Sequence, residues 1–318
     1  MIVNILLLIL GFAILIKCAD YFVDGASSLA RNFKLSTMFI GLTIVSFGTS
    51  APEFAVSIQS LLRGSGDIVL GNVIGSNILN ILLILGLSSL FHSLSVKNNT
   101  VKKELPITIL ITSLFVVLIS DIALGNGDNM FTRQDGIVLL LFFTVFIYYL
   151  IRMMRNKIDD DTEDDEKPMY SVGMSIFWGV VGIAGIILGS NLVVNYASLI
   201  AGQLGVSERM ISLTIVALGT SLPELVTSVS ATRKGEYDIA IGNVVGSNIF
   251  NLGIVLGLPV AILGGIEHIS FQFVDLIVLL LSAFLLFIFS YNDRKITRFE
   301  GVLMLILFVI YYSFVIMA

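Results

Sequence analysis

The sequence of 318 residues has few of the side chains on which disulfide-rich domains and metalloenzymes depend. It holds one cysteine, Cys18, and two histidines, which excludes a disulfide framework and leaves few soft ligands for a transition metal. Charged residues make up 13% of the chain, whereas a soluble domain carries about 25%. No HExxH motif is present, and no Ser/His or paired-Asp arrangement stands out in the apolar runs, so an intramembrane hydrolase is disfavoured.

Long apolar runs are what the sequence has instead. Hydrophobic residues make up 56% of the chain, the mean hydropathy is +0.98, and runs near 20 residues recur from end to end. Runs of that length cross a bilayer as helices. The sequence therefore predicts an all-α polytopic membrane protein with ten transmembrane helices. The predicted spans are 2–28, 38–62, 68–92, 104–121, 134–152, 173–200, 207–231, 238–262, 273–290 and 297–316.

Basic residues are unequally divided between the two sets of loops that this layout predicts. With the N-terminus outside, fourteen Lys and Arg residues fall in inside loops and three in outside loops, and Lys17 within the first span completes the total of 18. Cytoplasmic loops of membrane proteins are enriched in Lys and Arg. The distribution predicts a multi-pass plasma-membrane protein with both termini outside.

The sequence repeats itself at a constant offset of 171 residues. When 40–87 is aligned with 211–258 without a gap, 25 of 48 positions are identical, and 16 of these are Gly, Pro or polar residues. Packing alone would preserve the apolar pattern at least as well as the polar one, so the bias predicts a shared polar site. Each half holds five spans, an odd number, so the second half enters the membrane from the opposite side. This is an inverted-topology repeat, which is common among secondary transporters.

The repeat divides the chain into three parts. These are a first five-helix repeat at 1–157 with its motif region at 39–90, an acidic cytoplasmic linker at 158–170, and a second five-helix repeat at 171–318 with its motif region at 210–261. Seven of the eight residues 159–166 are acidic. About 20 residues connect the halves, too few for a folded domain, and we expect a solvated linker.

The motifs GTSAPE at 48–53 and GTSLPE at 219–224 lie near the middle of the second and seventh spans. Proline has no N–H and crowds the carbonyl four residues earlier, so Pro52 and Pro223 free the carbonyls of Gly48 and Gly219. An unpaired carbonyl at membrane depth is tolerated only in a protein interior or a polar cavity. We therefore expect a broken helix at each motif, with backbone oxygens that a cation can satisfy.

The next span in each half carries a second motif, GNVIGSNILN or GNVVGSNIFN. Ser76 and Asn80 are four residues apart and share a helix face, as do Ser247 and Asn251. Together with the two motif glutamates, these groups offer hydroxyl, amide, carbonyl and carboxylate oxygens, which are the ligands of hard cations. Two carboxylates balance one divalent ion, and Ca²⁺ accepts irregular oxygen geometry; the same oxygens suit Na⁺.

The paired GTSxPE and GNVxGSN motifs resemble the α-repeats of the sodium/calcium exchanger family, within the wider cation/calcium antiporter group. The resemblance implies a secondary active antiporter that exchanges Na⁺ for Ca²⁺ by alternating access, an ion transporter rather than an enzyme. It implies Ca²⁺ and Na⁺ as substrates and the lipid bilayer as surroundings. We expect no cofactor, no nucleic acid and no obligate protein partner.

The resemblance also implies ligands, residue by residue. Glu53 and Glu224, with the carbonyls of Thr49 and Thr220, would form a central Ca²⁺ site. The flanking Na⁺ sites would use Ser50, Ser76 and the Ser46 carbonyl on one side and Ser221, Ser247 and the Ala217 carbonyl on the other, with Asn80 and Asn251 bordering the centre. Some relatives, including potassium-dependent members, carry aspartate at the position of Asn251, so the amide here argues against K⁺ co-transport.

Two other functions remain open at this point. A Ca²⁺/H⁺ exchanger of the same fold would use the two glutamates to bind calcium and protons alternately, although the Ser, Thr and Asn ligands around the acids favour sodium. A passive cation channel would carry a steady current without a counter-ion. The sodium dependence of calcium flux separates these possibilities.

Other polar residues have structural explanations. Lys17, Asp20 and Asp24 lie at i, i+3 and i+7 of the first span, where a local salt bridge explains them. Asp67 and Asp238 each precede an apolar span, which favours helix N-capping. Asn72 and Asn243, near helix starts, are expected to be structural.

Overall fold

The computed structural model describes residues 1–318 except 122–129, 157–166, 207–214, 216, 268–272 and 318. The helices are α1 (Ile2–Phe33), α2 (Thr37–Ile40), α3 (Ser46–Thr49), α4 (Ala51–Leu62), α5 (Gly66–Leu79), α6 (Gly86–Phe91), α7 (Leu105–Leu118), α9 (Arg133–Asn156), α10 (Val172–Gln203), α12 (Ala217–Gly219), α13 (Leu222–Arg233), α14 (Tyr237–Phe250), α15 (Gly257–Leu263), α16 (Phe273–Asn292) and α17 (Arg298–Met317). Short π-helical runs are η1 (Gly41–Val45), η2 (Asn80–Leu85), η3 (Thr100–Glu104) and η5 (Asn251–Leu256). The short strands β1 (Leu94–Ser95) and β2 (Lys295–Ile296) pair antiparallel.

The described helices include seven that are long and apolar enough to cross a membrane, or eight if the bent pair Thr37–Thr49 and Ala51–Leu62 is one span. The expectation of a mostly helical membrane protein is therefore confirmed. The predicted span 104–121 holds α7, which has 14 residues. The predicted span 207–231 holds α13, which has 12 residues. The first residues of this span lie outside the described residues, and so does the acidic run 159–166. The count of ten spans remains a prediction.

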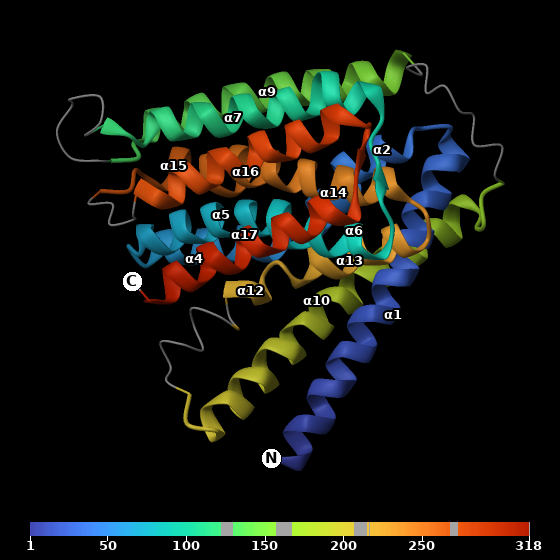
Figure 1. The fold of residues 1–318 in the computed structure, drawn as a ribbon, viewed down its shortest axis with the longest axis horizontal. Coiled ribbons are helices and arrows are strands. Elements are labelled where there is room, and N and C mark those ends of the chain that lie inside the picture. The colour runs from blue at the N-terminus through green and yellow to red at the C-terminus, as the bar shows by residue number, and fades with distance from the viewer. Residues whose placement is uncertain (122–129, 157–166, 207–214, 216, 268–272, 318) are drawn as a thin grey trace.

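Two long helices lean against a bundle whose members run in roughly one direction. In Figure 1, α4, α5, α7, α9, α14, α15, α16 and α17 follow the long axis of the molecule, and α1 and α10 cross it obliquely as a pair. Each of these two helices has 32 residues. Small residues bring them close: a Cβ added to Gly25 of α1 would lie 2.8 Å from the Ser175 carbonyl oxygen of α10. Close backbone approach at glycine is typical of helix packing in membranes.

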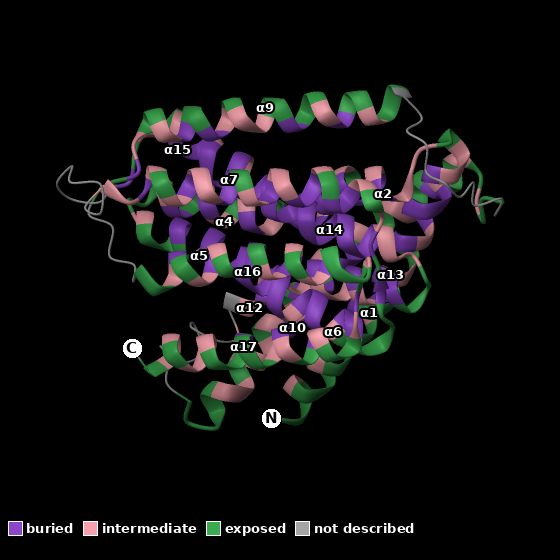
Figure 2. Ribbon diagram, turned by 45° about the horizontal axis from the view of Figure 1, so that its top comes forward, coloured by how far each residue is buried: buried purple, intermediate pink, exposed green. Residues whose placement is uncertain are grey.

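The helices that carry the second motif lie at the centre of the bundle. The most apolar windows of Gly66–Phe91 and Tyr237–Leu263 are 72% and 78% buried, whereas those of α1, α9 and α17 are 17% buried. Figure 2 shows the same gradient, with α14 largely buried and α9 exposed along its outer side. A membrane protein that presents apolar side chains outward and polar groups inward has this distribution, because lipid cannot satisfy polar atoms.

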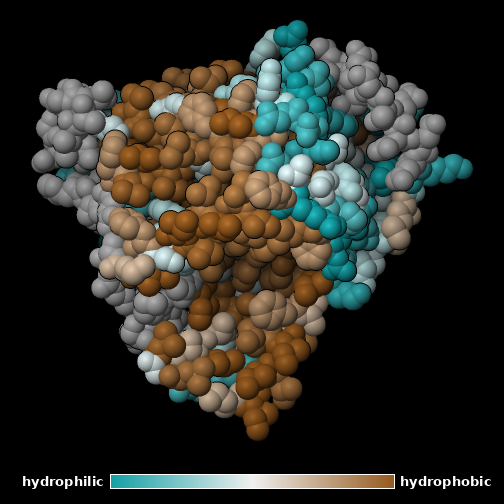
Figure 3. Space-filling view, viewed as in Figure 1, coloured by the Kyte–Doolittle hydropathy of each residue, from teal (hydrophilic) through white to brown (hydrophobic). Residues whose placement is uncertain are grey.

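The surface of the molecule separates an apolar belt from a hydrophilic end. In Figure 3, hydrophobic residues cover most of the visible face, and hydrophilic residues gather at the end of the molecule where α7 begins and α9 ends. The last turns of α9 carry Arg152 and Arg155, which belong to a loop that the positive-inside rule assigns to the cytoplasm. The gathering of polar residues at this end agrees with that assignment.

Two structural expectations for acidic residues are wrong. Asp24 does not depend on a local salt bridge, because its carboxylate lies 2.6 Å from Lys234 Nζ, and Asp20 accepts from Ser230 Oγ at 2.6 Å. Asp238 is not an N-cap. It lies in the first turn of α14, accepts from Thr37 Oγ1 at 3.1 Å and lies 2.9 Å from Lys97 Nζ. In each case a partner distant in the sequence replaces the local one.

The close contact of α1 with α10 gives a stability prediction. Gly25→Ala places a Cβ within 3.0 Å of backbone atoms of Ser175 and Gly179, so we expect the two helices to separate slightly, at about 1–3 kcal/mol of unfolding free energy. Gly179→Ala is the matched control, since its Cβ meets nothing within 4 Å. Thermal unfolding in detergent measures the difference. Equal Tm values for the two variants would contradict the close approach.

Candidate functional site

The helix breaks expected at the two proline motifs are present. α3 ends at Thr49, α4 begins at Ala51, and the two segments meet at a bend of 45°. In the second half, α12 ends at Gly219 and α13 begins at Leu222. Each proline occupies the first turn of the new helix, where a backbone N–H would have no partner within that helix. Each motif glutamate lies in the same turn, where the helix dipole favours negative charge.

Glu53 and Glu224 are buried, at 1% and 0% exposure, and they meet across the interface of the two halves. Ser50 Oγ donates to Glu224 Oε1 at 2.9 Å, and Ser221 Oγ donates to Glu53 Oε1 at 3.3 Å. Each serine stands three residues before the glutamate of its own half and bonds to the glutamate of the other half. The crossed pairs bring both carboxyl groups into one polar centre.

The second oxygen of each carboxyl group has no hydrogen-bond partner among the described residues. The same is true of the amide oxygens of Asn80 and Asn251, and all four atoms are buried. These oxygens form two pairs related by the 171-residue offset. An unsatisfied buried acceptor costs about 1–3 kcal/mol, and more when it is charged. Cations are partners that can satisfy such acceptors without any hydrogen-bond donor.

The donor set determines which ions fit this centre. The described residues contain no group of three or more His, Cys, Asp or Glu side chains that could hold a metal ion. The centre instead combines two carboxylates with neutral hydroxyl and amide oxygens. Such a set suits hard cations, because Ca²⁺ and Na⁺ prefer oxygen ligands and accept mixed neutral and charged donors.

The remaining predicted ligands of the first half lie at this centre. Ser46, Thr49, Ser50 and Ser76 are all buried. Ser76 Oγ and Ser221 Oγ lie 3.2 Å apart, within hydrogen-bond distance, which links the two halves. The Ser46 carbonyl accepts the Ser50 backbone N–H at 3.0 Å and lies 3.3 Å from Thr49 Oγ1. Part of its capacity as an acceptor is therefore already used.

In the second half, Ser221, Ser247 and Asn251 are fully or almost fully buried, and Thr220 is half-buried. Ser247 Oγ has no partner among the described residues. Ala217 begins α12, and its side chain lies outside the described residues. The described contacts therefore bring Ser221 to the first-half residues Glu53 and Ser76, and Asn251 to Asn77, whereas Ser247 and Thr220 are located by burial alone.

The second half uses one of its freed carbonyls in a way that the sequence did not indicate. Ser190 Oγ, on α10, donates to the Gly219 carbonyl at 2.8 Å. This is the carbonyl that Pro223 prevents from accepting an α-helical bond. The position equivalent to Ser190 in the first half is Ala19, which has no donor. The Gly219 carbonyl is therefore held by a side chain of a long oblique helix, and no equivalent side chain can hold the Gly48 carbonyl.

Asparagines fix the backbone around the glutamates. Asn72 Nδ2 donates to the Glu53 carbonyl at 3.2 Å, and Asn243 Nδ2 donates to the Glu224 carbonyl at 3.4 Å. Asn243 Oδ1 also accepts from Thr49 Oγ1 at 3.0 Å. Both asparagines have the structural role that their positions near helix starts predict, and their contacts place them beside the acids. Their identity at the 171-residue offset was the available signal.

A second pair of asparagines joins the halves directly. Asn77 Nδ2 donates to the Asn248 carbonyl and Asn248 Nδ2 donates to the Asn77 carbonyl, both at 3.2 Å. Asn80 Nδ2 donates to Asn248 Oδ1 at 3.0 Å, and Asn251 Nδ2 donates to Asn77 Oδ1 at 3.1 Å. Reciprocal contacts between equivalent residues are those of a two-fold relation. Here they relate the halves of one chain, and they orient the amide groups of Asn80 and Asn251.

Comparison with known proteins agrees with this arrangement. The family described as "Sodium/calcium exchanger protein" matches residues 3–152 and 174–317. The putative antiporter CaxA of Alkalimonas amylolytica is 38% identical over 98% of this chain and 98% of its own length. The sodium/calcium exchanger MaX1 of Methanosarcina acetivorans is 33% identical over 96% of this chain and 97% of its own length.

Solved structures of the sodium-calcium exchanger NCX_Mj share the fold. A structure from a crystal soaked with 10 mM Na⁺ and zero Ca²⁺ superposes with a TM-score of 0.83 at 33% identity, and covers 98% of each chain. A second, soaked with 2.5 mM Na⁺ and 0.1 mM Ca²⁺, gives 0.84 at 32% identity, again over 98% of each chain. Because the family model matches both halves and relatives above 30% identity extend over nearly the whole length, the chain belongs to the sodium/calcium exchanger family.

Proposed function

We propose that this chain is a secondary active antiporter that exchanges Na⁺ for Ca²⁺ across the plasma membrane by alternating access. The observation that carries the proposal is the pair of buried carboxyl groups, Glu53 and Glu224, each with one oxygen hydrogen-bonded by a serine of the other half and one oxygen without a partner among the described residues. Two acids so placed need positive charge. Both ions compete for this one centre.

The physical basis for exchange is the cost of an empty site. A charged group at the centre of a bilayer costs about 2.5–3.5 kcal/mol on insertion scales, and two neighbouring acids also repel each other. A bound Ca²⁺ ion, or several Na⁺ ions, removes this penalty. The carrier then changes its facing direction only when it is loaded. One ion must therefore replace the other before the return step, and this condition produces antiport.

The proposed ligands are those of the two motifs. Ca²⁺ binds Glu53 and Glu224 with the carbonyls of Thr49 and Thr220. The proposed Na⁺ ligands are Ser50, Ser76 and the Ser46 carbonyl in the first half, and Ser221, Ser247 and the Ala217 carbonyl in the second, with Asn80 and Asn251 at the border of the centre. The buried amide oxygens of both asparagines, which no described donor reaches, support their place in this set.

The membrane layout is part of the proposal. Ten spans, two inverted five-helix repeats at 1–157 and 171–318, and both termini outside follow from the loop charges and the repeat. Reciprocal hydrogen bonds between Asn77 and Asn248 support the two-fold relation of the repeats. The hydrophilic end of the surface in Figure 3 supports the assignment of the basic loops to the cytoplasm.

A Ca²⁺/H⁺ exchanger of the same fold is the second candidate. Buried carboxyl groups can carry protons as well as metal ions, and their charge can be neutralised by either. The neutral oxygens around Glu53 and Glu224 favour the sodium reading, since a proton needs no shell of hydroxyl and amide ligands.

Calcium-45 uptake into proteoliposomes tests the proposed coupling. We expect vesicles loaded with Na⁺ to accumulate Ca²⁺, and vesicles loaded with Li⁺ or K⁺ to show only the uptake of protein-free vesicles, because sodium must leave for calcium to enter. A proton gradient in the absence of Na⁺ is the control for the second candidate. Ca²⁺ uptake that does not depend on internal Na⁺ would refute Na⁺/Ca²⁺ exchange.

Substitution of the acids tests the site. Glu53→Gln and Glu224→Gln each remove one of two charges that balance Ca²⁺ and keep the side-chain volume, so we expect sodium-dependent uptake to fall to the protein-free level. Glu267→Gln is the control, because Glu267 is exposed. Thermal unfolding confirms that each variant is folded. Normal exchange in either site variant would refute the assignment.

A further inference from the structure

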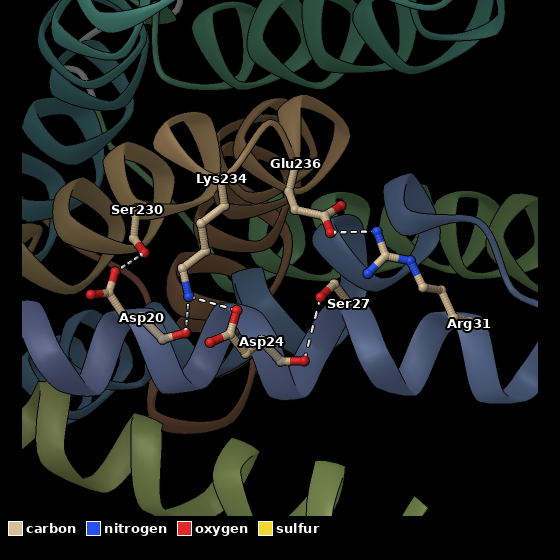
Figure 4. Close-up of polar contacts among 7 residues, drawn as sticks. All are labelled: Asp20, Asp24, Ser27, Arg31, Ser230, Lys234 and Glu236. Atoms are coloured by element: carbon tan, nitrogen blue, oxygen red, sulfur yellow. Dashed lines mark hydrogen bonds and ion pairs between the residues drawn. The ribbon is translucent and has the colours of Figure 1, made fainter. Parts of the chain in front are cut away.

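A group of charged contacts outside the candidate site holds α1 to the turn between α13 and α14 (Figure 4). Lys234 Nζ lies 2.6 Å from Asp24 Oδ1 and donates to the Asp20 carbonyl oxygen at 2.7 Å. Arg31 Nη2 lies 2.8 Å from Glu236 Oε1. We call this group the α1 clasp; it consists of Asp20, Asp24 and Arg31 on α1 and of Ser230, Lys234 and Glu236 on the facing segment.

The Arg31–Glu236 pair makes the observed register of the clasp the one in which all its contacts form together. Along α1 the sequence of charges is acid, acid, base, and the facing segment offers a hydroxyl to Asp20, a base to Asp24 and an acid to Arg31. A slide of α1 by one helical turn, about 5.4 Å, would separate Arg31 from Glu236, although in one direction it would bring Asp20 toward the place of Asp24 opposite Lys234. The paired side chains are 13–28% exposed, so solvent screens them less than it screens a surface pair.

The other half cannot build an equivalent clasp. At the 171-residue offset, α10 carries Asn191, Asn195 and Gly202 in place of the three charged residues of α1. The turn between α4 and α5 carries Gln59, Arg63 and Ser65 in place of Ser230, Lys234 and Glu236. Arg63 is the only charged residue among these six, so no ion pair can form between them. The clasp therefore belongs to one end of the molecule.

We infer that the α1 clasp is a conformational lock that closes one side of the carrier and is made in only one of its two facing states. The inference rests on the proposed alternating-access function. In an inverted repeat, the opposite state forms when each half takes the arrangement of the other. α10 then packs against the α4–α5 turn, and α1 leaves the α13–α14 turn. The exchange breaks the ion pairs of the clasp, and the six equivalent positions of the other half form none in return.

The lock sets the resting state of the carrier. Its side is the one that the basic loops assign to the cytoplasm. The carrier therefore rests closed to the cytoplasm and open to the outside, where Na⁺ is abundant and sodium entry begins the exchange. Weakening the clasp moves the equilibrium toward the inward-facing state.

A buried cysteine reports on the lock. Ala231 of α13 is 0% exposed and belongs to a hydrophobic cluster with Val23, Ala26 and Ala30 of α1. We introduce Ala231→Cys into a Cys18→Ala background, so that the reporter is the only thiol in the chain. A membrane-impermeant maleimide applied from either side of proteoliposomes then measures how often α1 separates from α13, and from which side.

Charge reversal and charge swap form the test. Lys234→Asp breaks the clasp, and we expect labelling of the reporter thiol from the clasp side to rise about fivefold, equivalent to about 1 kcal/mol for a partly buried ion pair. The double variant Asp24→Lys with Lys234→Asp restores the pair in reverse, and we expect labelling to return toward the starting rate. Arg63→Asp, at the equivalent position of the other half, is the matched control and should leave the rate unchanged.

Each outcome has a defined meaning. Unchanged labelling in Lys234→Asp, or an increase that the folded charge-swap variant does not reverse, overturns the lock; Tm values show that the variants are folded. Sodium-dependent Ca²⁺ uptake is measured on the same vesicles. If the parent protein shows no sodium-dependent uptake, the proposed function is refuted. If uptake is normal but labelling in Lys234→Asp is unchanged, only the lock is refuted.

Discussion

Two carboxyl groups buried in an apolar bundle must be stabilised by hydrogen bonds or by positive charge, and the groups around them are arranged accordingly. Glu53 and Glu224 lie at helix starts, where the dipole favours negative charge, and each accepts a serine hydroxyl from the opposite half. Asparagines hold the backbone beside them. Among the described residues, these contacts satisfy one oxygen of each carboxyl and leave the other open. The protein stabilises its acids only in part, and the two unsatisfied oxygens are the observation on which the proposed cation site rests.

The broken helices and the central asparagines have different roles around the two acids. The breaks at Pro52 and Pro223 place acids and backbone oxygens at the same depth, since a continuous helix would bond every carbonyl to its own N–H groups. The amide network of Asn77 and Asn248 holds the two motif-bearing spans against each other at the centre. α1 and α10 pack against each other through small residues, and they also contact the motif glycines Gly48 and Gly219 from the outside of the bundle. The amide-linked centre and the oblique pair are therefore distinct parts of the fold that meet at the helix breaks.

Local rules predicted the helix breaks and the placement of the two acids beside them, because proline chemistry and the identity of polar residues across the repeat act within a few positions. The full set of oxygen ligands rests on the family resemblance and stays a prediction. Local rules failed where a partner lies far along the chain. The i, i+3 spacing of Asp20 suggested a neighbour on α1, but Ser230 and Lys234 are the partners. The bond from Ser190 to Gly219 was hidden because Ala19 breaks the repeat there. Tertiary packing, not helix periodicity, decides these contacts.

The reciprocal bonds of Asn77 and Asn248 make the middle of the molecule resemble a homodimer folded from one chain. In a true homodimer one mutation alters both subunits together, so residues on the axis stay matched automatically. Fusion removes that safeguard: if one copy of the axial asparagine changes alone, the other loses its complement. Sites away from the axis have the opposite freedom, and Ser190 opposite Ala19 is a divergence of that kind. Residues away from the axis can therefore diverge between the two halves. The two central asparagines cannot change independently, because each bonds to the other.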